Sequence, residues 1–550
     1  MKRRSLPSLP SRHDTAAGVV LGVQSVPSGL AVGLLAGINP SAGLYGYMVG
    51  TAGGALTTSS AFMAVQGTSA MAILIADVPG LRGEDAQRTL VTLTLLTGAV
   101  MLVAGLLRLG SVLRFVSNAV MVGFMSAVGV NIVLGQLADL TGYEAEGGNR
   151  VVAAFNTLVR PDRMNGPTVL VGLATIALIV LLGRTRLGAM GLAIAVIATS
   201  AAVRIGDWEQ VATLNDLGVT IDSLPSPELP RLRSIPTLLL PAVSLAFVGL
   251  VQGAGISATF PNPDGTYPDS SRDFVGQGVG NIASGVLRGM PVGGSVSASA
   301  INKQAGARTR MSLFVAAAVM AVVIIVFGDA VGSIAMPALA GLLILVGIRT
   351  VKPASLATVW KAGIVQKAVL TVTFGLTMLI PLQYAVLVGV GLSIVLHVVR
   401  QSTQVTIRRQ VLDPDGDLVE TEPPVTLPPN QVVILQPYGS LFFAAAPVIE
   451  TMLPDPGPDT TGSVVILRLR GRTDVGTTFM EVLHRYATAL AAADSKLVLA
   501  SVSERVQEQL EVAGVTDVVD AADLYLGDER IGATLRRAHN DALAWVASRR

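Results

Sequence analysis

The dominant feature of the first 400 residues is a series of long apolar stretches separated by short polar connections. Most approach the roughly 20 residues that a helix needs to cross the hydrocarbon core of a membrane. They predict fourteen spans, near residues 16–36, 41–57, 68–78, 88–107, 116–137, 167–183, 187–203, 235–257, 274–287, 294–304, 311–328, 334–349, 367–381 and 384–399. Two of these, 68–78 and 294–304, are too short to cross a membrane alone.

Basic residues recur in alternate connections, as expected when those connections face the cytoplasm. The connection after the eighth span contributes little, and loops such as 138–166 are mixed in charge. The start of the chain is basic but lacks a signal-peptide cleavage pattern. The basic residues that set the orientation are Arg108, Arg114, Arg184, Arg186, Lys303, Arg308, Arg310, Arg349, Lys352, Lys361, Lys367, Arg400, Arg408 and Arg409. We therefore predict a multi-pass protein of the cell (inner) membrane with both termini in the cytoplasm.

The pattern changes beyond residue 400. This part holds 20 acidic and 13 basic residues, whereas the first 400 hold 17 and 26. Residues 410–430 are rich in proline and acids, which disfavour helix. Apolar β-branched runs at 431–443, 463–471 and 496–503 then alternate with amphipathic segments, and this alternation predicts a small α/β domain. The predicted organisation is a cytoplasmic N-terminus (1–15), a transmembrane transport domain (16–400), a linker (401–430) and a cytosolic domain (431–550).

Composition excludes several classes of protein. Only 14% of the residues are charged, against about a quarter in soluble domains. The chain has no cysteine, so disulfides and thiolate metal sites are impossible. Its four histidines are scattered, and no nucleophile–base pair is evident. We expect neither an enzyme nor a bound metal or cofactor.

An internal symmetry links the two halves of the membrane region. The first span contains Gln24 within apolar sequence, and 44 residues later the first short segment opens around Thr68. The eighth span contains Gln252, and 43 residues later the second short segment opens at Ser295. Each half has seven spans, an odd number, so the copies must be inverted relative to each other. This 7+7 inverted repeat with two half-helices is typical of secondary transporters.

The half-helices predict an anion site. The first turn of a helix has unpaired N–H groups and the positive end of the helix dipole. Such an end is tolerated at membrane depth only where it faces protein or water. Two opposed ends can hold an anion, with glycines such as Gly67, Gly293 and Gly294 permitting close approach of the backbone. Hydroxyl groups of Thr68, Ser69, Ser295 and Ser297 can donate to its oxygens.

The chain resembles the SulP family of anion transporters, which combine fourteen spans with a cytosolic STAS domain. "SVPSGLAVGLLAGINPSAGLYGYMVG" (25–50) is similar to the family's first two spans. "PDSSRDFVGQGVGNIASGVLRGMPVGGSVSASAINKQAGARTR" (268–310) is similar to its most specific stretch. The resemblance implies an anion site between the first, third, eighth and tenth spans. The matching positions are Ser25, Ser28, Gly67, Thr68, Ser69, Gln252, Gly294, Ser295, Val296 and Ser297, with Gln24, Gln66 and Ala298 as possible supporting residues.

Three departures from the family pattern affect the expected site. Gln66-Gly67-Thr68 replaces Gly-Pro-Thr, Gln252 replaces a residue that is acidic in several members, and Ala298 replaces an arginine of some members. The site is thus expected to rely on dipoles and hydroxyls alone. Because Gln252 offers no carboxylate, we expect transport that does not require sodium.

The C-terminal domain resembles a STAS domain, with one change at its characteristic turn. Asp474-Val475-Gly476-Thr477 replaces the usual Asp-Ser-Thr-Gly. Phosphorylation at the usual serine is therefore impossible, and Thr477 and Thr478 are the candidate replacements. The resemblance implies a homodimer, or a cytosolic regulator at this domain. Besides the bilayer, the expected partner is a small anion of the sulfate, bicarbonate or dicarboxylate class, and not a nucleic acid.

Two alternatives remain at this stage. A nucleobase permease shares the expected architecture, but it would want an acidic residue at membrane depth and would normally lack the C-terminal domain. A membrane-anchored signalling scaffold without transport activity would also suit a site that has no coupling charge.

Overall fold

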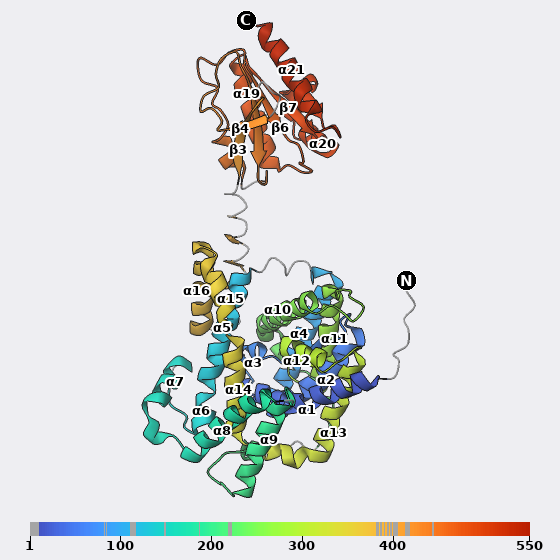
Figure 1. Cartoon of the computed structure of the whole chain (residues 1–550), viewed down its shortest axis with the longest axis vertical. Helices are drawn as coiled ribbons and strands as arrows, with labels where there is room; N and C mark the ends of the chain where they lie inside the picture. Colours follow the sequence, from blue (N-terminus) through green and yellow to red (C-terminus); the bar gives the residue numbers. More distant parts are fainter. Residues whose placement is uncertain are drawn as a thin grey trace. The chain divides into compact units, whose positions relative to one another are not determined.

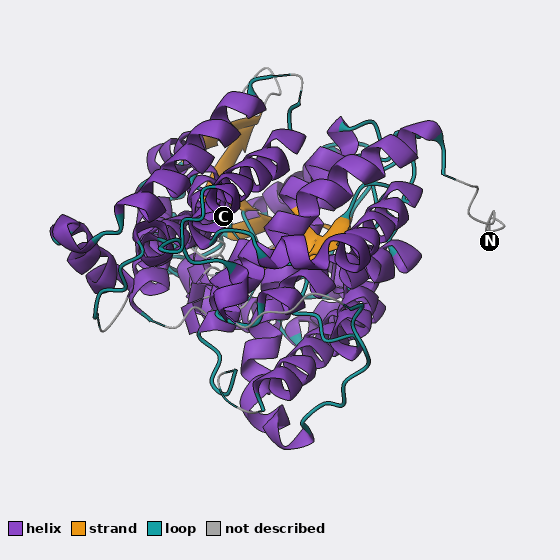
Figure 2. Ribbon diagram, turned by 90° about the horizontal axis from the view of Figure 1, so that it is seen from below, coloured by secondary structure: helices purple, strands orange, loops and turns teal. Residues whose placement is uncertain are grey.

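A computed structural model describes residues 10–81, 83, 85–110, 117–147, 150–185, 187–217, 223–380, parts of 384–399, 405–412, 418–442 and 445–549. The chain divides into two compact units, Met1–Ser393 and Ile394–Arg550. Figure 1 labels many of the helices and strands of both units, and Figure 2 colours helices, strands and loops separately.

The predicted spans of unit 1 are confirmed as helices wherever they are described. Seven described helices are long and apolar enough to cross a membrane. The fourteenth predicted span, 384–399, is only partly described. The thirteen helices that match predicted spans are α1 (Arg12–Leu35), α2 (Pro40–Thr57), α3 (Ser69–Ala76), α4 (Ala86–Leu106), α5 (Asn118–Gly135), α8 (Gly166–Gly183), α9 (Met190–Ile205), α10 (Ile235–Thr259), α11 (Ser270–Val286), α12 (Val296–Gln304), α13 (Met311–Gly332), α14 (Met336–Thr350) and α16 (Ile364–Leu379).

Unit 1 also contains short elements that the hydrophobic pattern did not predict. The connection 138–166 folds into α6 (Leu137–Thr141), α7 (Arg150–Val159) and a 3₁₀ turn, η2 (Pro161–Arg163). Helix α15 (Pro353–Lys361) precedes α16, and η3 (Leu214–Leu217) and η4 (Leu232–Ser234) lie between α9 and α10. All are shorter than a membrane span, so a search for long apolar runs does not detect them.

Two three-residue strands lie within this helical unit. Strand β1 (Ala64–Gln66) precedes α3, and β2 (Gly293–Ser295) runs directly into α12. The strands pair antiparallel, with Ala64 opposite Ser295 and Gln66 opposite Gly293. Each half of the unit therefore contributes one strand and one short helix to a shared element.

Helix packing in unit 1 has the pairwise symmetry that the predicted repeat requires. In the first half, α4 packs against α10 and α11 of the second half. In the second half, α13 packs against α1 and α2 of the first half in the same way. Helices α2 and α11 contact each other, as do α5 and α14. Exchanging each helix for its counterpart turns this set of contacts into itself, which agrees with an inverted repeat.

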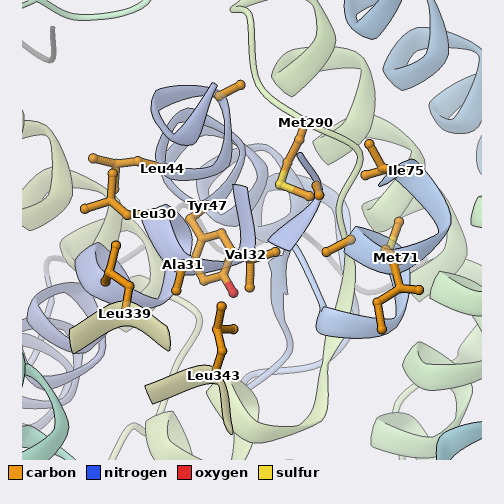
Figure 3. Packing of buried hydrophobic residues seen from close by; sticks show 14 of the residues in the cluster. Leu30, Ala31, Val32, Leu44, Tyr47, Met71, Ile75, Met290, Leu339 and Leu343 are labelled. Carbon is orange, nitrogen blue, oxygen red and sulfur yellow. The ribbon is translucent and has the colours of Figure 1, made fainter. Parts of the chain in front are cut away.

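A buried apolar cluster joins the helices around the first half-helix. Tyr47 of α2 lies with Ala31 and Val32 of α1 and Leu343 of α14 in this cluster (Figure 3). The helices approach closely where glycines meet. A Cβ on Gly43 would lie 2.1 Å from the carbonyl oxygen of Gly29, so no larger residue fits between α1 and α2 at this point.

Unit 2 is a six-stranded sheet with helices on both faces. Its strands are β3 (Thr406–Leu412), β4 (Leu418–Thr421), β5 (Val432–Tyr438), β6 (Val464–Arg468), β7 (Lys496–Val502) and β8 (Leu524–Leu526), in the order β4-β3-β5-β6-β7-β8. Strands β5 to β8 are parallel, and β3 and β4 are antiparallel to their neighbours. The helical elements are α18 (Ala446–Glu450), α19 (Thr477–Ala492), α20 (Glu504–Val512), η5 (Val515–Asp517), η6 (Ala521–Asp523) and α21 (Ala533–Ala547).

The predicted α/β pattern of this unit is confirmed, with one difference near its start. One apolar cluster contains residues of α18, α19 and α20, and a second contains residues of α21. The range 401–430, interpreted as a linker, contains β3 and β4. Its prolines, at 414, 423, 424, 428 and 429, all lie outside these strands, so they do not interrupt the ladder.

Candidate functional site

The site is built from the two places where the membrane helices begin in the interior of unit 1. Thr68 caps α3, where its Oγ1 accepts a hydrogen bond from the Met71 N–H at 3.3 Å. Ser295 caps α12 in the same way, through the Ala298 N–H at 3.4 Å. Because both caps adjoin the β1–β2 pair, the two helix N-termini flank one strand pair and belong to opposite halves of the repeat.

Helix α11 satisfies the backbone of the broken segment before α12. The Asn281 amide forms two bonds with Val292: Oδ1 accepts from its N–H at 2.9 Å, and Nδ2 donates to its carbonyl at 2.6 Å. Gln277 Oε1 accepts from the Gly294 N–H at 2.9 Å. Ser284 Oγ donates to the Met290 carbonyl at 2.8 Å. These side-chain hydrogen bonds satisfy backbone groups of residues 290–294 that have no helical partner. A non-helical backbone inside a membrane requires such partners.

Asp273 lies on the same polar stripe of α11 and is completely buried. Its carboxylate accepts hydrogen bonds from the Thr58 hydroxyl at 2.7 Å and from the Ser257 hydroxyl at 2.7 Å. It also accepts from the N–H and the hydroxyl of Ser59, at 2.7 and 2.8 Å. Asp273 thereby joins the end of α2, the end of α10 and the start of α11.

The first half of the repeat holds its strand differently. Gln66, at the end of β1, donates through Nε2 to Ser25 Oγ at 3.0 Å and to Thr51 Oγ1 at 3.2 Å. All three side chains are buried. Ser25, predicted to contact the anion, is therefore hydrogen-bonded to the end of β1. Gln66, predicted as a supporting residue, is the donor of that bond.

Two glutamine side chains at equivalent places in the repeat have incomplete hydrogen bonding. On α1, Ser28 Oγ donates to the Gln24 carbonyl at 3.0 Å, while Gln24 Oε1 is buried without a partner among the described residues. On α10, the Gln252 amide nitrogen reaches only the Met125 sulfur, at 3.9 Å. Its Oε1 is likewise buried without a described partner.

The remaining predicted residues lie around the two helix starts. Val296 is 45% exposed and Ser297 is also exposed, and the hydroxyls of Ser295 and Ser297 are 3.4 Å apart. Ala298 is buried in an apolar cluster, and Thr68 and Ser69 are half-buried.

Two glycines at these helix starts allow neighbouring segments of the protein to pack closely against the backbone. A Cβ on Gly294 would lie 2.7 Å from Gly253 Cα, and one on Gly67 would lie 3.0 Å from the Tyr47 ring. The structure therefore brings residues 66–69 and 293–297 together, with Ser25 attached through Gln66. Gln252 directly precedes Gly253, which faces Gly294, but its own side chain reaches Met125 of α5. Gln24 and Ser28 are on α1, which contacts both half-helices.

Thr477 and Thr478 lie in unit 2, at the first turn of α19. Thr477 is exposed and Thr478 is half-buried. Nothing in the fold of unit 2 assigns either residue a role.

No charged side chain belongs to the predicted site, whose polarity comes from hydroxyls, amides and helix N-termini. Within the described residues, no group of three or more His, Cys, Asp or Glu side chains could hold a metal ion. Gln277 and Asp273 are functional candidates that the hydrophobic pattern and the repeat do not reveal. A polar residue at every third or fourth position of α11 (273, 277, 281 and 284) was the available signal.

A helical unit with paired half-helices and several membrane-length apolar helices, followed by a small α/β unit, is the architecture of a multi-pass membrane protein with a separate C-terminal domain. The chain belongs to the sulfate permease family, whose pattern matches residues 12–373. Residues 424–538 match the STAS domain.

Named proteins that are similar to this chain support the family assignment. A probable sulfate transporter of Mycobacterium tuberculosis (strain H37Rv) is 28% identical over 351 residues, which are 62% of this chain and 62% of the relative's length. The bicarbonate transporter BicA of Picosynechococcus is 25% identical over 452 residues, 80% of each chain. The structure of the murine anion transporter Slc26a9 in the inward-facing state superimposes with a TM-score of 0.82 at 18% identity, and covers 98% of this chain and 92% of that chain. The fold of the whole chain is therefore that of this transporter.

Proposed function

We propose that the protein is a secondary transporter of small anions of the sulfate, bicarbonate or dicarboxylate class. One observation carries the proposal: two hydroxyl-capped half-helices start at one antiparallel strand pair in the interior of unit 1. Helix N-termini attract anions without a formal positive charge. The names of the sulfate and bicarbonate transporters that resemble the chain support the substrate class.

The anion would lie between the starts of α3 and α12. Thr68, Ser69, Ser295 and Ser297 would donate hydroxyl hydrogen bonds, and free N–H groups of the first helical turns would add to them. Glycines at 67 and 294 would allow the backbone to approach, and Ser25, Ser28, Val296 and Gln252 would complete the surroundings. Gln24, Gln66 and Ala298 would support these groups.

Transport would proceed by alternating access. One domain would move against the other and expose the anion to each side in turn, and the mobile domain would hold α1, α3, α10 and α12. The support for a single body is that β1 and β2 share backbone hydrogen bonds and that α1 and α10 each contact both half-helices. The protein would lie in the cell (inner) membrane with both termini in the cytoplasm.

The C-terminal unit would regulate transport, bind a cytosolic partner or support a homodimer. Thr477 and Thr478 are the positions at which phosphorylation would be sought. The proposed limits are 16–400 for the transport domain and 431–550 for the STAS-like domain, with 1–15 as a cytoplasmic terminus and 401–430 as the connection.

The first prediction concerns Ser295, which caps α12. Ser295→Trp should abolish uptake of labelled sulfate, bicarbonate or succinate into liposomes containing the purified protein, because an indole fills the space before the half-helix. The matched control is Val322→Trp on α13, where the side chain is 53% exposed, and its uptake should equal that of the wild type. Uptake of uracil with no uptake across the anion panel would overturn the proposal in favour of a nucleobase permease.

The second prediction concerns coupling. The family resemblance places Gln252 where several members have an acidic residue that helps to bind sodium or a proton in some of them, and a glutamine cannot provide a charged ligand. Uptake of the preferred anion should therefore be the same within error when external sodium is replaced by potassium or choline. A strict requirement for sodium would contradict this prediction and point to a cation site elsewhere in the protein.

A further inference from the structure

A short helix with an exposed tryptophan lies between two of the predicted membrane spans. Helix α15 connects α14, which ends at Thr350, to α16, which begins at Ile364. Residues 351–363 form the whole connection, so α15 stays close to the membrane face at which both spans end. The helix packs against α5 and α16, and its Val359 is buried (Figure 1).

The connection and its flanks carry four basic residues, here called the basic patch. The patch comprises Arg349, Lys352, Lys361 and Lys367. The first three side chains are exposed and the fourth is half-buried. Residues 330–412 contain no Asp or Glu, and none of the four side chains forms an ion pair with a described residue. The described part of the chain therefore leaves this positive charge unneutralised.

Large apolar side chains are exposed beside these charges. Trp360 is 52% exposed and Ile364 is 78% exposed. Lys367 Nζ lies 5.5 Å from the centre of the Trp360 ring, so a cation and the indole occupy one place on the surface. Tryptophan is enriched at the headgroup level of membranes, where its ring contacts lipid and its N–H reaches water. Apolar side chains next to basic ones are typical of a helix that lies in the membrane interface.

We propose that α15 lies in the membrane interface and binds the headgroups of anionic phospholipids. The basic patch contacts the headgroup phosphates, while Trp360 and Ile364 enter the boundary of the acyl chains. The proposed orientation of the chain places this connection on the cytoplasmic side, where the leaflet surface is negative and attracts Lys and Arg. The inference adds a second ligand site and does not depend on which anion is transported.

An acidic protein surface is the other partner that a basic patch attracts, and residues 401–550 themselves hold 20 acidic and 13 basic residues. Two observations favour lipid. The connection is short and begins and ends at membrane spans, and its exposed side chains include Trp360 and Ile364 as well as lysines. A lipid surface offers anionic groups and apolar chains together, and it matches both parts of this surface.

The test measures quenching of Trp360 fluorescence by brominated phospholipids in vesicles that contain the full chain. The chain has three tryptophans, so Trp208→Phe and Trp545→Phe leave Trp360 as the only indole. The vesicles are mixtures of phosphatidylcholine and phosphatidylglycerol, with bromine on the acyl chains of one lipid or of the other. The quenching should show a preference for phosphatidylglycerol of at least about fivefold at Trp360, which is what one basic side chain near an anionic leaflet provides.

Lys352→Gln combined with Lys361→Gln removes two exposed charges of the basic patch. This variant should lower the preference for phosphatidylglycerol by about fivefold or more. Quenching by both lipids should persist, which shows that the variant is folded and that Trp360 still lies at the bilayer. Arg160→Gln combined with Arg163→Gln is the matched control. It removes the same charge from exposed positions in the connection 138–166, and it should leave the preference unchanged.

Four results would overturn the inference. Equal quenching by the two lipids, or an unchanged preference in the lysine variant, would mean that the basic patch does not bind headgroups. Absence of quenching by either lipid would mean that Trp360 does not lie at the bilayer. Quenching that appears only after removal of residues 401–550 would identify unit 2 as the partner of this surface. No transport enters the measurement, so the proposed function is tested separately.

Discussion

Buried polar side chains in unit 1 differ in how completely they are hydrogen-bonded. Asp273 and Asn281 have several short hydrogen bonds each to neighbouring segments. Gln252 and Thr373 have incomplete ones. Asp273 and Asn281 hold neighbouring segments together, whereas Gln252 and Thr373 have side-chain oxygens that bond to no described residue.

The third prediction is at this scale. Asp273→Asn should destabilise the protein by at least about 2 kcal/mol, because an amide loses the charge-assisted bonds and places N–H donors against other donors. The measurement is the thermal midpoint of the purified protein in detergent. Asp329→Asn, at an exposed position on α13, is the control and should leave the midpoint unchanged. A midpoint for Asp273→Asn equal to that of the wild type would contradict this account.

Single residues could be predicted from the sequence only where the repeat made them stand out. Ser295 and Gln252 have counterparts in the first half at nearly the same spacing, so comparison of the halves singled them out. Asp273 and Gln277 have no such counterpart. Their role depends on residues 290–294 folding back along α11, which is a tertiary contact that local pattern does not encode.

At the scale of elements, the half-helices depend on close contact between backbones. A Cβ added to Gly294 of β2 would lie 2.7 Å from the Cα of Gly253 in α10. A Cβ added to Gly375 of α16 would have no described atom within 4 Å. The two positions therefore test different consequences of the same chemical change. One glycine is required by its surroundings, and the other is required by nothing in the described structure.

The fourth prediction compares them. Gly294→Ala should lower the thermal midpoint and reduce anion uptake, because the added methyl forces β2 away from α10. Gly375→Ala should be neutral or stabilising by about 0.5–1 kcal/mol, since alanine favours the helix. Uptake and thermal midpoint are measured for both variants. Wild-type behaviour of Gly294→Ala would show that the contact is not needed.

Most elements of unit 1 could be predicted, because a membrane imposes long apolar helices. Strands β1 and β2 could not. Each has three residues, and neither "AVQ" nor "GGS" has a strand pattern of its own. The pairing exists because backbone groups that leave a helix inside a membrane must find partners, and the nearest partners are those of the other half.

At the scale of the whole molecule, unit 2 begins earlier than its sequence suggested. Strands β3 and β4 lie between residues 406 and 421 and complete the sheet through β5. The prolines of this region disfavour helix, but they lie between and after the short strands and leave both strands intact. The boundary of the C-terminal unit is therefore a matter of strand pairing, not of composition.

The fifth prediction follows from this boundary. Removal of residues 401–550 should change the transport rate or the oligomeric state but leave the order of preference among anions unchanged, because the proposed site lies wholly in unit 1. Removal of residues 431–550 should in addition cause aggregation, since β3 is left with an unpaired edge. Light scattering and the anion panel measure both outcomes. A changed order of preference among anions after removal of residues 401–550 would contradict the assignment of the site to unit 1.

The strand pair also bears on how the two halves of the chain can diverge. Its hydrogen bonds join main-chain atoms, so the bonds themselves place little demand on side-chain identity, and the halves already differ completely at these three paired positions. A substitution that moves either strand must nevertheless be compensated in the other. The two repeats are therefore expected to diverge in sequence during evolution. A change that is tolerated in one strand should nevertheless depend on the residues present in the other.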